Sequence, residues 1–170
     1  MSKNRPAARR PLYTAAERVR RDSTKWTLVQ GLLAPVQFLA FAVSVVLVIH
    51  YLVTGTGYQA ATISILVKTF LLYLIMVTGA IWEKVVFGQY LLAPAFFWED
   101  MFSFAVITLH TLYLIALWTG FLTPSQQMFL ALAAYATYAI NAAQFIWKLR
   151  MARLDAARND GSQLDAAVQA

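Results

Sequence analysis

The sequence contains no cysteine. Disulfides, zinc thiolate sites, iron–sulfur ligation by the chain and a cysteine nucleophile are therefore all excluded. Charge is also scarce, because 13% of the 170 residues are charged, against about 25% in a soluble domain. Aspartate and glutamate together number only 8. With so few acidic residues in the chain, the position of each one is informative.

Long apolar runs take the place of the missing charge. Hydrophobic residues make up 60% of the chain and the mean hydropathy is +0.58, whereas a soluble domain is about 45–50% apolar. A transmembrane helix needs about 20 consecutive apolar residues. Four segments meet this length, at residues 26–52, 60–86, 96–118 and 126–149. The sequence therefore predicts an all-α integral membrane protein, built as one four-helix bundle.

Basic residues gather at the two ends of the chain and explain its net charge of +6. Most of the 14 lysines and arginines precede the first apolar run or lie at and beyond the end of the last: Lys3, Arg5, Arg9, Arg10, Arg18, Arg20, Arg21, Lys25, Lys148, Arg150, Arg153 and Arg158. Basic flanks stay on the cytoplasmic side of a membrane. This predicts that both termini are cytoplasmic, as an even number of spans requires, and it leaves no need for a nucleic-acid partner.

Three segments divide the chain. Residues 1–25 form a basic N-terminal segment, in which residues 1–11 are predicted to be disordered. Thr14 to Lys25 are predicted to form a short interfacial helix, with Thr14 and Glu17 as a capping box. Residues 26–149 are the transmembrane domain, and residues 150–170 are predicted to form a short, fraying helical tail.

The junction between the second and third apolar runs, residues 82–100, is the most informative part of the chain. It holds three carboxylates, one ammonium and flanking aromatic side chains: Glu83, Glu99, Asp100, Lys84, Trp82 and Trp98. Charges beside hydrocarbon need a partner, a water-filled cavity or a function. A Glu83–Lys84 surface pair contributes little, and Trp82 and Trp98 also fit an aromatic belt. Three acids in two clusters nevertheless favour a functional site.

Polar residues in the apolar runs recur at helical spacing. In the third run Glu99, Ser103, Val106, His110, Tyr113 and Leu117 share one face, and in the second run Thr69, Tyr73, Met76, Ala80 and Glu83 do. Glu99 and His110 lie about 16 Å apart along a helix, so one large flat ligand could contact both. Transmembrane glutamine and asparagine side chains are more typical of interhelical hydrogen bonds. His110 is equally consistent with packing and with ligand binding, and Lys68 is expected to extend toward the membrane surface.

Three segments resemble a known family: DSTKWTLVQG at residues 22–31, VTGAIWEKVVFG at residues 77–88 and APAFFWED at residues 93–100. They resemble the 3-vinyl bacteriochlorophyllide hydratases, named 2-vinyl in the older nomenclature, and the resemblance extends over roughly residues 11–150. These are membrane enzymes of bacteriochlorophyll synthesis in phototrophic bacteria. The resemblance implies a bacterial inner, intracytoplasmic membrane as the location.

The resemblance also implies a reaction, in which water adds across the C3 vinyl group of a chlorin or bacteriochlorin to give a 1-hydroxyethyl group. No redox change occurs and no cofactor is expected, in agreement with the lack of a dinucleotide or phosphate fingerprint. A proton must reach the terminal vinyl carbon, and water must then attack the inner carbon. Such a reaction needs an acid and a base in different environments. Glu83 and Glu99 are predicted to share these roles, with Asp100 orienting the water or replacing one of them.

The pigment implied by the resemblance suggests further binding residues. A flat apolar ring would suit aromatic side chains, and its propionate would pair with a lysine. His110 is a candidate axial ligand to the substrate magnesium, although no metal site of the protein itself is predicted. The predicted substrate-binding residues are Lys84, Lys25, His110, Trp82, Trp98, Phe97 and Tyr73.

Two other functions remain open from the sequence. A non-catalytic pigment-binding or assembly protein would use the aromatic residues and His110 without needing the acids. A small transporter could relay protons through Lys68, Glu83 and His110, but transporters usually carry an internal repeat and none is evident. The expected partners are the pigment, water and lipid, with a second copy of the chain or other pigment-synthesis enzymes as further alternatives.

Overall fold

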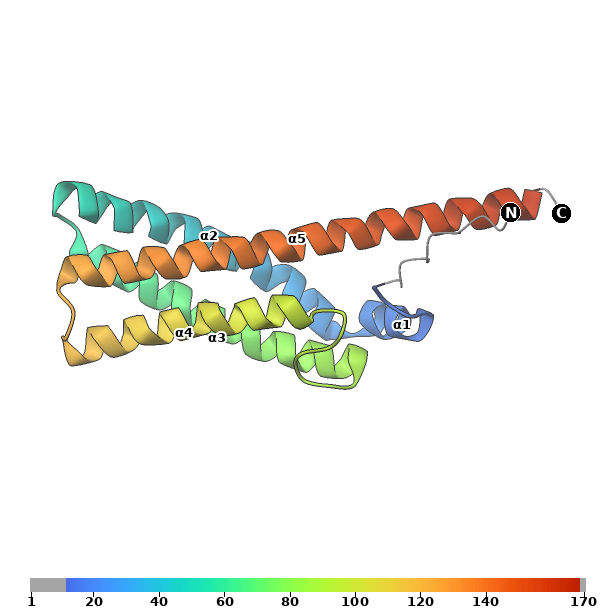
Figure 1. The fold of residues 1–170 in the computed structure, drawn as a ribbon, viewed down its shortest axis with the longest axis horizontal. Helices are drawn as coiled ribbons and strands as arrows, with labels where there is room; N and C mark the ends of the chain where they lie inside the picture. Colours follow the sequence, from blue (N-terminus) through green and yellow to red (C-terminus); the bar gives the residue numbers. More distant parts are fainter. Residues whose placement is uncertain (1–11, 169–170) are drawn as a thin grey trace, which may run out of the picture.

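The computed structural model describes residues 12–168, with side chains placed as far as residue 154. The described part contains five helices and no strand: α1 (Ala15–Ser23), α2 (Lys25–Thr54), α3 (Tyr58–Phe87), α4 (Phe97–Thr119) and α5 (Pro124–Val168) (Figure 1). The all-α prediction is confirmed. The predicted disorder of residues 1–11 falls outside the described residues.

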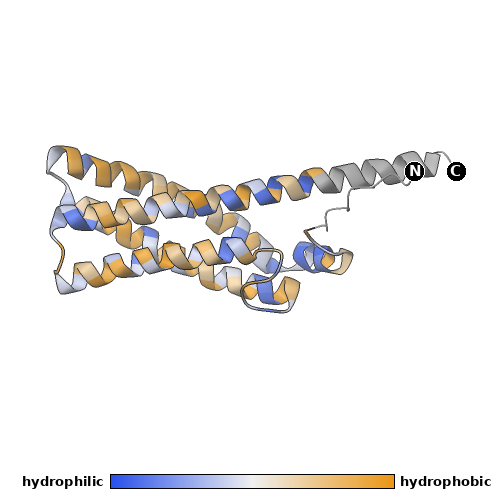
Figure 2. Ribbon diagram, viewed as in Figure 1, coloured by the Kyte–Doolittle hydropathy of each residue, from blue (hydrophilic) through white to orange (hydrophobic). Residues whose placement is uncertain are grey.

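Four of the helices are long and apolar enough to cross a membrane: Lys25–Thr54, Tyr58–Phe87, Phe97–Thr119 and Pro124–Leu154. Hydrophobic residues run along all four (Figure 2). Large apolar side chains point outward, including Leu28, Leu39 and Phe70, which are 76%, 66% and 66% exposed. Outward-facing apolar surface of this extent is unfavourable in water. The prediction of a four-span membrane bundle is therefore confirmed.

The bundle is assembled from two helical hairpins. Helix α2 packs mainly on α3, helix α4 packs mainly on α5, and contacts between α2 and α5 join the hairpins. One apolar core includes Val48, Ile65, Tyr113 and Met128. Contacts between α3 and α4 are few. Side-chain bonds from Lys68 to His110 and from Tyr73 to Thr111 join the two helices in the interior, and the loop between them bonds both helices at the α1 end.

Helix α1 begins with the predicted capping box. The Thr14 amide donates to Glu17 Oε2 at 2.7 Å, and the Glu17 amide donates to Thr14 Oγ1 at 3.3 Å. Arg20 Nε donates to the Val86 carbonyl at 2.8 Å, which fixes α1 against the end of α3. A short N-terminal helix is thus present, and its position at a membrane interface stays a prediction.

Residues 150–168, within the predicted helical tail, continue α5 without a break. Figure 1 shows this part of α5 extending past the other helices, at the same end of the bundle as α1. The two described ends of the chain therefore lie on one side, as four spans require.

Candidate active site at the α1 end of the bundle

Glu83 and Asp100 come from different helices and hold the same loop. Helix α3 ends at Phe87 and is capped by Gly88, whose φ of 87° is left-handed, and the connecting loop (residues 88–96) then folds back to α4. The Leu92 amide donates to Asp100 Oδ2 at 2.7 Å, and the Ala93 amide donates to Glu83 Oε2 at 3.3 Å. Two carboxyl groups thus converge on successive backbone amides, and we call them the carboxyl pair.

The carboxyl pair is withdrawn from solvent. Glu83 is 5% exposed and Asp100 is 3% exposed, and each lies within electrostatic range of the other. Leu92 has a φ of 60° and is the only non-glycine residue with positive φ in residues 12–168. Such a conformation costs about 1–3 kcal/mol and persists only where its surroundings enforce it. The bond from Leu92 to Asp100 supplies part of that restraint.

Glu99 neighbours the carboxyl pair but faces another helix. Lys148 Nζ donates to Glu99 Oε2 at 2.6 Å, with the two side chains 26% and 9% exposed. One turn along, Asn141 Nδ2 donates to Ser103 Oγ, and Ser103 Oγ donates to the Glu99 carbonyl. Asn141, Ser103, Glu99 and Lys148 therefore form a polar ladder between α4 and α5.

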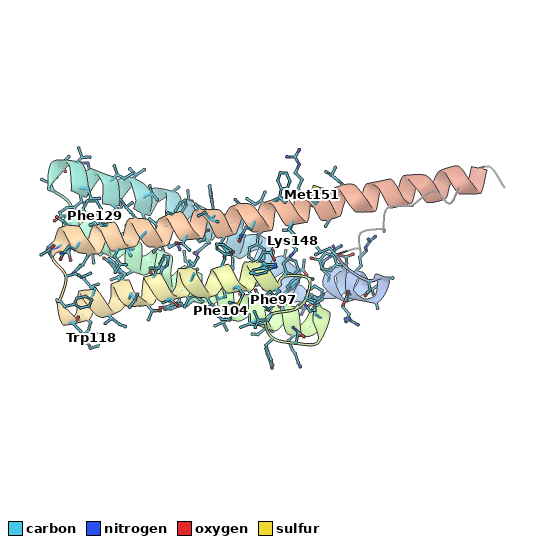
Figure 3. The ribbon with its side chains drawn as sticks, viewed as in Figure 1. Phe97, Phe104, Trp118, Phe129, Lys148 and Met151 are labelled. Atoms are coloured by element: carbon cyan, nitrogen blue, oxygen red, sulfur yellow. The ribbon has the colours of Figure 1, made fainter. Side chains whose placement is uncertain are left out.

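An open groove of about 680 Å³ runs beside this ladder. It is lined by residues of α4 and α5: Glu99, Ile140, Ala143, Gln144, Trp147, Lys148 and Met151. Ligand pockets are commonly about 300–1,000 Å³ and mostly apolar, with a few convergent polar groups. Figure 3 shows Lys148 and Phe97 at the α1 end, with Trp118 and Phe129 at the opposite end. The groove thus offers an apolar surface with the Glu99–Lys148 ion pair at its edge.

A cluster of aromatic rings packs against the end of the connecting loop. Tyr13, Trp82, Phe87, Phe96 and Phe145 make successive ring contacts, with Tyr13 stacked on Phe87 at 5.8 Å and Phe96 stacked on Phe145 at 5.8 Å. Trp82 Nε1 donates to Thr27 Oγ1 at 2.9 Å. The cluster thus joins Tyr13, which precedes α1, to α3, α5 and the connecting loop, and the Trp82 bond adds α2.

The other predicted binding residues are distributed around this end. Lys84 is exposed and donates to the Gly88 carbonyl at 2.7 Å, and Lys25 is exposed at the start of α2. Phe97 and Trp98 pack edge to face and are 40% and 69% exposed. Tyr73 lies farther into the bundle, where its hydroxyl bonds Thr111 Oγ1 at 2.8 Å. None of these five lines the groove.

His110 lies in the bundle interior, paired with Lys68. Lys68 Nζ and His110 Nε2 are 2.9 Å apart, and His110 Nδ1 bonds the Val106 carbonyl. Lys68 is fully buried and also lies 4.0 Å from the Tyr138 ring centroid. The expectation that Lys68 extends to the membrane surface is therefore wrong, because His110 and Tyr138 stabilise its ammonium inside. Axial ligation by His110 stays a prediction, and it requires the Lys68 contact to open.

Replacing His110 with Phe tests that prediction. If His110 ligates the substrate magnesium, His110→Phe should weaken pigment binding by about tenfold, since about 1.4 kcal/mol corresponds to that factor. Lys68→Met is the matched control, because it removes the same interior contact and leaves the imidazole free. Affinity is measured by absorption titration, and equal affinity of His110→Phe and the wild type rejects the ligand role.

Lys148→Met tests the ion pair of the polar ladder. Removing one partner of a fully buried pair costs about 3–5 kcal/mol. The cost is smaller here, because Lys148 is 26% exposed and water screens part of the charge left on Glu99. We therefore expect a lower unfolding temperature in detergent for Lys148→Met. The double variant Glu99→Gln with Lys148→Met should recover much of that stability, because no unpaired charge remains. A double variant as unstable as Lys148→Met contradicts a stabilising ion pair.

The sequence did not single out two groove residues, Lys148 and Gln144. In the sequence Lys148 belongs to the basic C-terminal flank. A signal was present in the spacing, because Asn141, Gln144 and Lys148 are three and four residues apart and share a helix face. None of the residues predicted for the site belongs to α5, and the sequence alone does not show that this face of α5 packs against α4.

The matches to known proteins cover the part of the chain that contains this site. A family model described as 2-vinyl bacteriochlorophyllide hydratase matches residues 13–151. The chain is 71% identical over 157 residues to the 2-vinyl bacteriochlorophyllide hydratase of Rhodobacter capsulatus, covering 92% of this chain and 91% of that protein. It is 71% identical over 156 residues to the enzyme of the same name from Cereibacter sphaeroides, covering 91% and 97%. No solved structure matches the chain.

Proposed function

The chain belongs to the 2-vinyl bacteriochlorophyllide hydratase family, and from this premise we propose that its reaction site is the acidic end of the bundle. The reaction is the hydration of the vinyl group of bacteriochlorophyllide, and the protein is a hydro-lyase of bacteriochlorophyll synthesis. One observation carries the placement: Glu83, Glu99, Asp100 and Lys148, from three helices, gather at one end of the bundle.

This end of the bundle faces the cytoplasm in the proposed arrangement. Described basic residues gather there, namely Arg18, Arg20, Arg21, Lys25, Lys84, Lys148, Arg150 and Arg153, and basic flanks favour the cytoplasmic side. In a phototrophic bacterium the corresponding membrane is the inner, intracytoplasmic membrane. Water then reaches the site from the cytoplasm while the apolar pigment approaches along the membrane.

The groove is the proposed binding site of the macrocycle. Ile140, Ala143 and Trp147 supply apolar surface, and a flat ring gains about 25 cal/mol for each Å² of apolar surface removed from water. Lys148 stands beside Glu99 at the groove, so it can pair with the pigment propionate. This adds a third lysine to the Lys84 and Lys25 proposed from the sequence.

Glu99 is the proposed base. Its carboxylate is paired with Lys148 at 2.6 Å, and a negative charge beside the vinyl group stabilises the cation that forms on the inner carbon. Water attacks that carbon, its oxygen forms the new C–O bond, and the released proton passes to Glu99. Lys148 also keeps the carboxylate oriented toward the groove.

The carboxyl pair is the proposed acid. Two carboxyl groups held together away from water do not both ionise readily, so the pair is proposed to hold one proton between Glu83 and Asp100. This proton goes to the terminal vinyl carbon and forms the C–H bond of the new methyl group. The proton taken up by Glu99 then restores the pair, so that one water is added in each cycle.

Purified protein tests the proposed function. Incubation with the vinyl pigment should give the 3-(1-hydroxyethyl) product, visible as a blue shift of the long-wavelength absorption band and separable by chromatography. A protein that binds the pigment without converting it would instead be a pigment-binding or assembly protein. Transport of protons in vesicles without conversion would support the transporter.

A further inference from the structure

Gln144 of α5 is a membrane amide whose side-chain oxygen makes no hydrogen bond to another helix among the described residues. Gln30 donates to Thr78, Gln127 bonds Tyr58, and Asn141 donates to Ser103. These bonds hold the bundle together in the usual manner of transmembrane amides. Gln144 Oε1 is buried and has no hydrogen-bond partner among the described residues. Asn141 Oδ1 is also buried without a partner, but Asn141 is held to Ser103 through its Nδ2.

A buried oxygen without a partner is unfavourable, by about 1–3 kcal/mol, unless something else donates to it. Gln37 Oε1 and Asn141 Oδ1 are also buried without a partner, but neither Gln37 nor Asn141 lines the groove. Gln144 does line the groove and shares this wall with Glu99 and Lys148. Since Gln144 and Lys148 are four residues apart on α5, their side chains are neighbours on one helix face.

We propose that Gln144 positions the attacking water of the hydration reaction. This inference rests on the proposed function of the groove. Once the Gln144 side chain turns its buried oxygen into the groove, water donates one hydrogen to Gln144 Oε1 and the other to the Glu99 carboxylate, whose Oε2 already accepts from Lys148. The water oxygen then directs a lone pair at the inner vinyl carbon. As the C–O bond forms, the proton between water and Glu99 moves to Glu99. Gln144 neither gains nor loses a proton.

Two acceptors on one water fix its orientation, and this has a stereochemical consequence. The cation on the inner carbon is planar and can be attacked from either face. A water held between Gln144 and Glu99 reaches it from one face only, so the new alcohol has one configuration. Gln144 is therefore a positioning residue that also selects the face of attack.

Three substitutions separate this role from a packing role. Gln144→Met keeps the length of the side chain but removes the acceptor, whereas Gln144→Glu keeps an acceptor. Gln144→Asn draws the oxygen back by about 1 Å, a displacement that can lower rate by about 100-fold. Gln37→Met is the matched control, because it removes another buried amide oxygen away from the groove.

The assay measures kcat, KM and the ratio of the two alcohol diastereomers by chromatography. Gln144→Met and Gln144→Asn should lower kcat by about 100-fold, change KM less than about threefold, and give both diastereomers. Gln144→Glu should retain more of the rate and selectivity than Gln144→Met, and Gln37→Met should keep the wild-type product ratio. Because Gln144→Asn removes only one methylene, it provides the test even where Gln144→Met does not fold.

The outcomes also separate this inference from the proposed function. If wild-type protein hydrates the pigment and the three Gln144 variants keep its rate and its single diastereomer, the positioning role is wrong while the function stands. If wild-type protein binds the pigment and forms no alcohol, the proposed function itself is wrong. If Gln37→Met loses selectivity as Gln144→Met does, the effect is one of packing and the positioning role is overturned.

Discussion

Replacing Glu99 with Gln is expected to lower kcat by about 10²- to 10⁴-fold, the range that general acid–base groups contribute. The glutamine side chain has nearly the same shape and still accepts a bond from Lys148, but it cannot take the proton of the attacking water. It also removes the negative charge beside the developing cation. Pigment affinity should change much less than kcat. Absorption titration measures binding, and the rate of product formation measures catalysis.

Glu17→Gln is the matched control for this experiment. Glu17 belongs to α1, away from the groove, and glutamine also completes a capping box. This variant should keep wild-type activity. A Glu99→Gln variant with wild-type kcat would exclude Glu99 as the base, and a Glu99→Gln variant that simply fails to bind pigment would assign Glu99 to substrate binding.

Loss of the carboxyl pair has the second large expected effect. Asp100→Asn and Glu83→Gln should each lower kcat by about 10²- to 10⁴-fold, because either change removes one member of the pair that holds the proton. Both amides keep an oxygen that can accept from the loop amides of Leu92 or Ala93. The double variant should be little slower than either single variant, since residues that act as a unit are not additive.

Asp22→Asn supplies the control for the aspartate change, because Asp22 is exposed and its partner is Arg21. Loop anchoring alone predicts a different pattern. If the carboxyl pair only holds the connecting loop, the single variants should lower the unfolding temperature while kcat stays near that of the wild type. Independent, multiplying losses in the double variant would contradict a shared proton.

Much of the fold could be predicted from periodicity and length. The face of the third run from Glu99 through Ser103, Val106 and His110 to Tyr113 is the buried face of α4. Helical spacing carries this information directly, because residues three and four apart share a face. The Thr14–Glu17 capping box is likewise a local pattern, and it is present as predicted.

The partners across helices could not be predicted in the same way. Nothing in the spacing of one helix says which face of another lies opposite, so the Lys148–Glu99 pair had no sequence signal of its own. Lys68 is the clearest case: a lysine near the end of a span usually extends to the surface. Here His110 and Tyr138 come from two other helices and hold it inside.

The three acids show what the sequence could predict and what it could not. Their clustering between two apolar runs predicted a site, but the sequence did not assign their roles. The structure divides them by environment: Glu83 and Asp100 meet at the connecting loop, whereas Glu99 faces Lys148 and the groove. That division underlies the proposed separation of acid from base.

A single turnover of purified protein in water labelled with both ¹⁸O and deuterium tests the central claim most directly. Hydration at the acidic end predicts a product with ¹⁸O in its hydroxyl group and one deuterium in its new methyl group. The Asp100→Asn and Glu99→Gln variants should bind the pigment and return it unlabelled within the same time. Unlabelled pigment returned by the wild-type protein, or full labelling by both variants, would contradict the account.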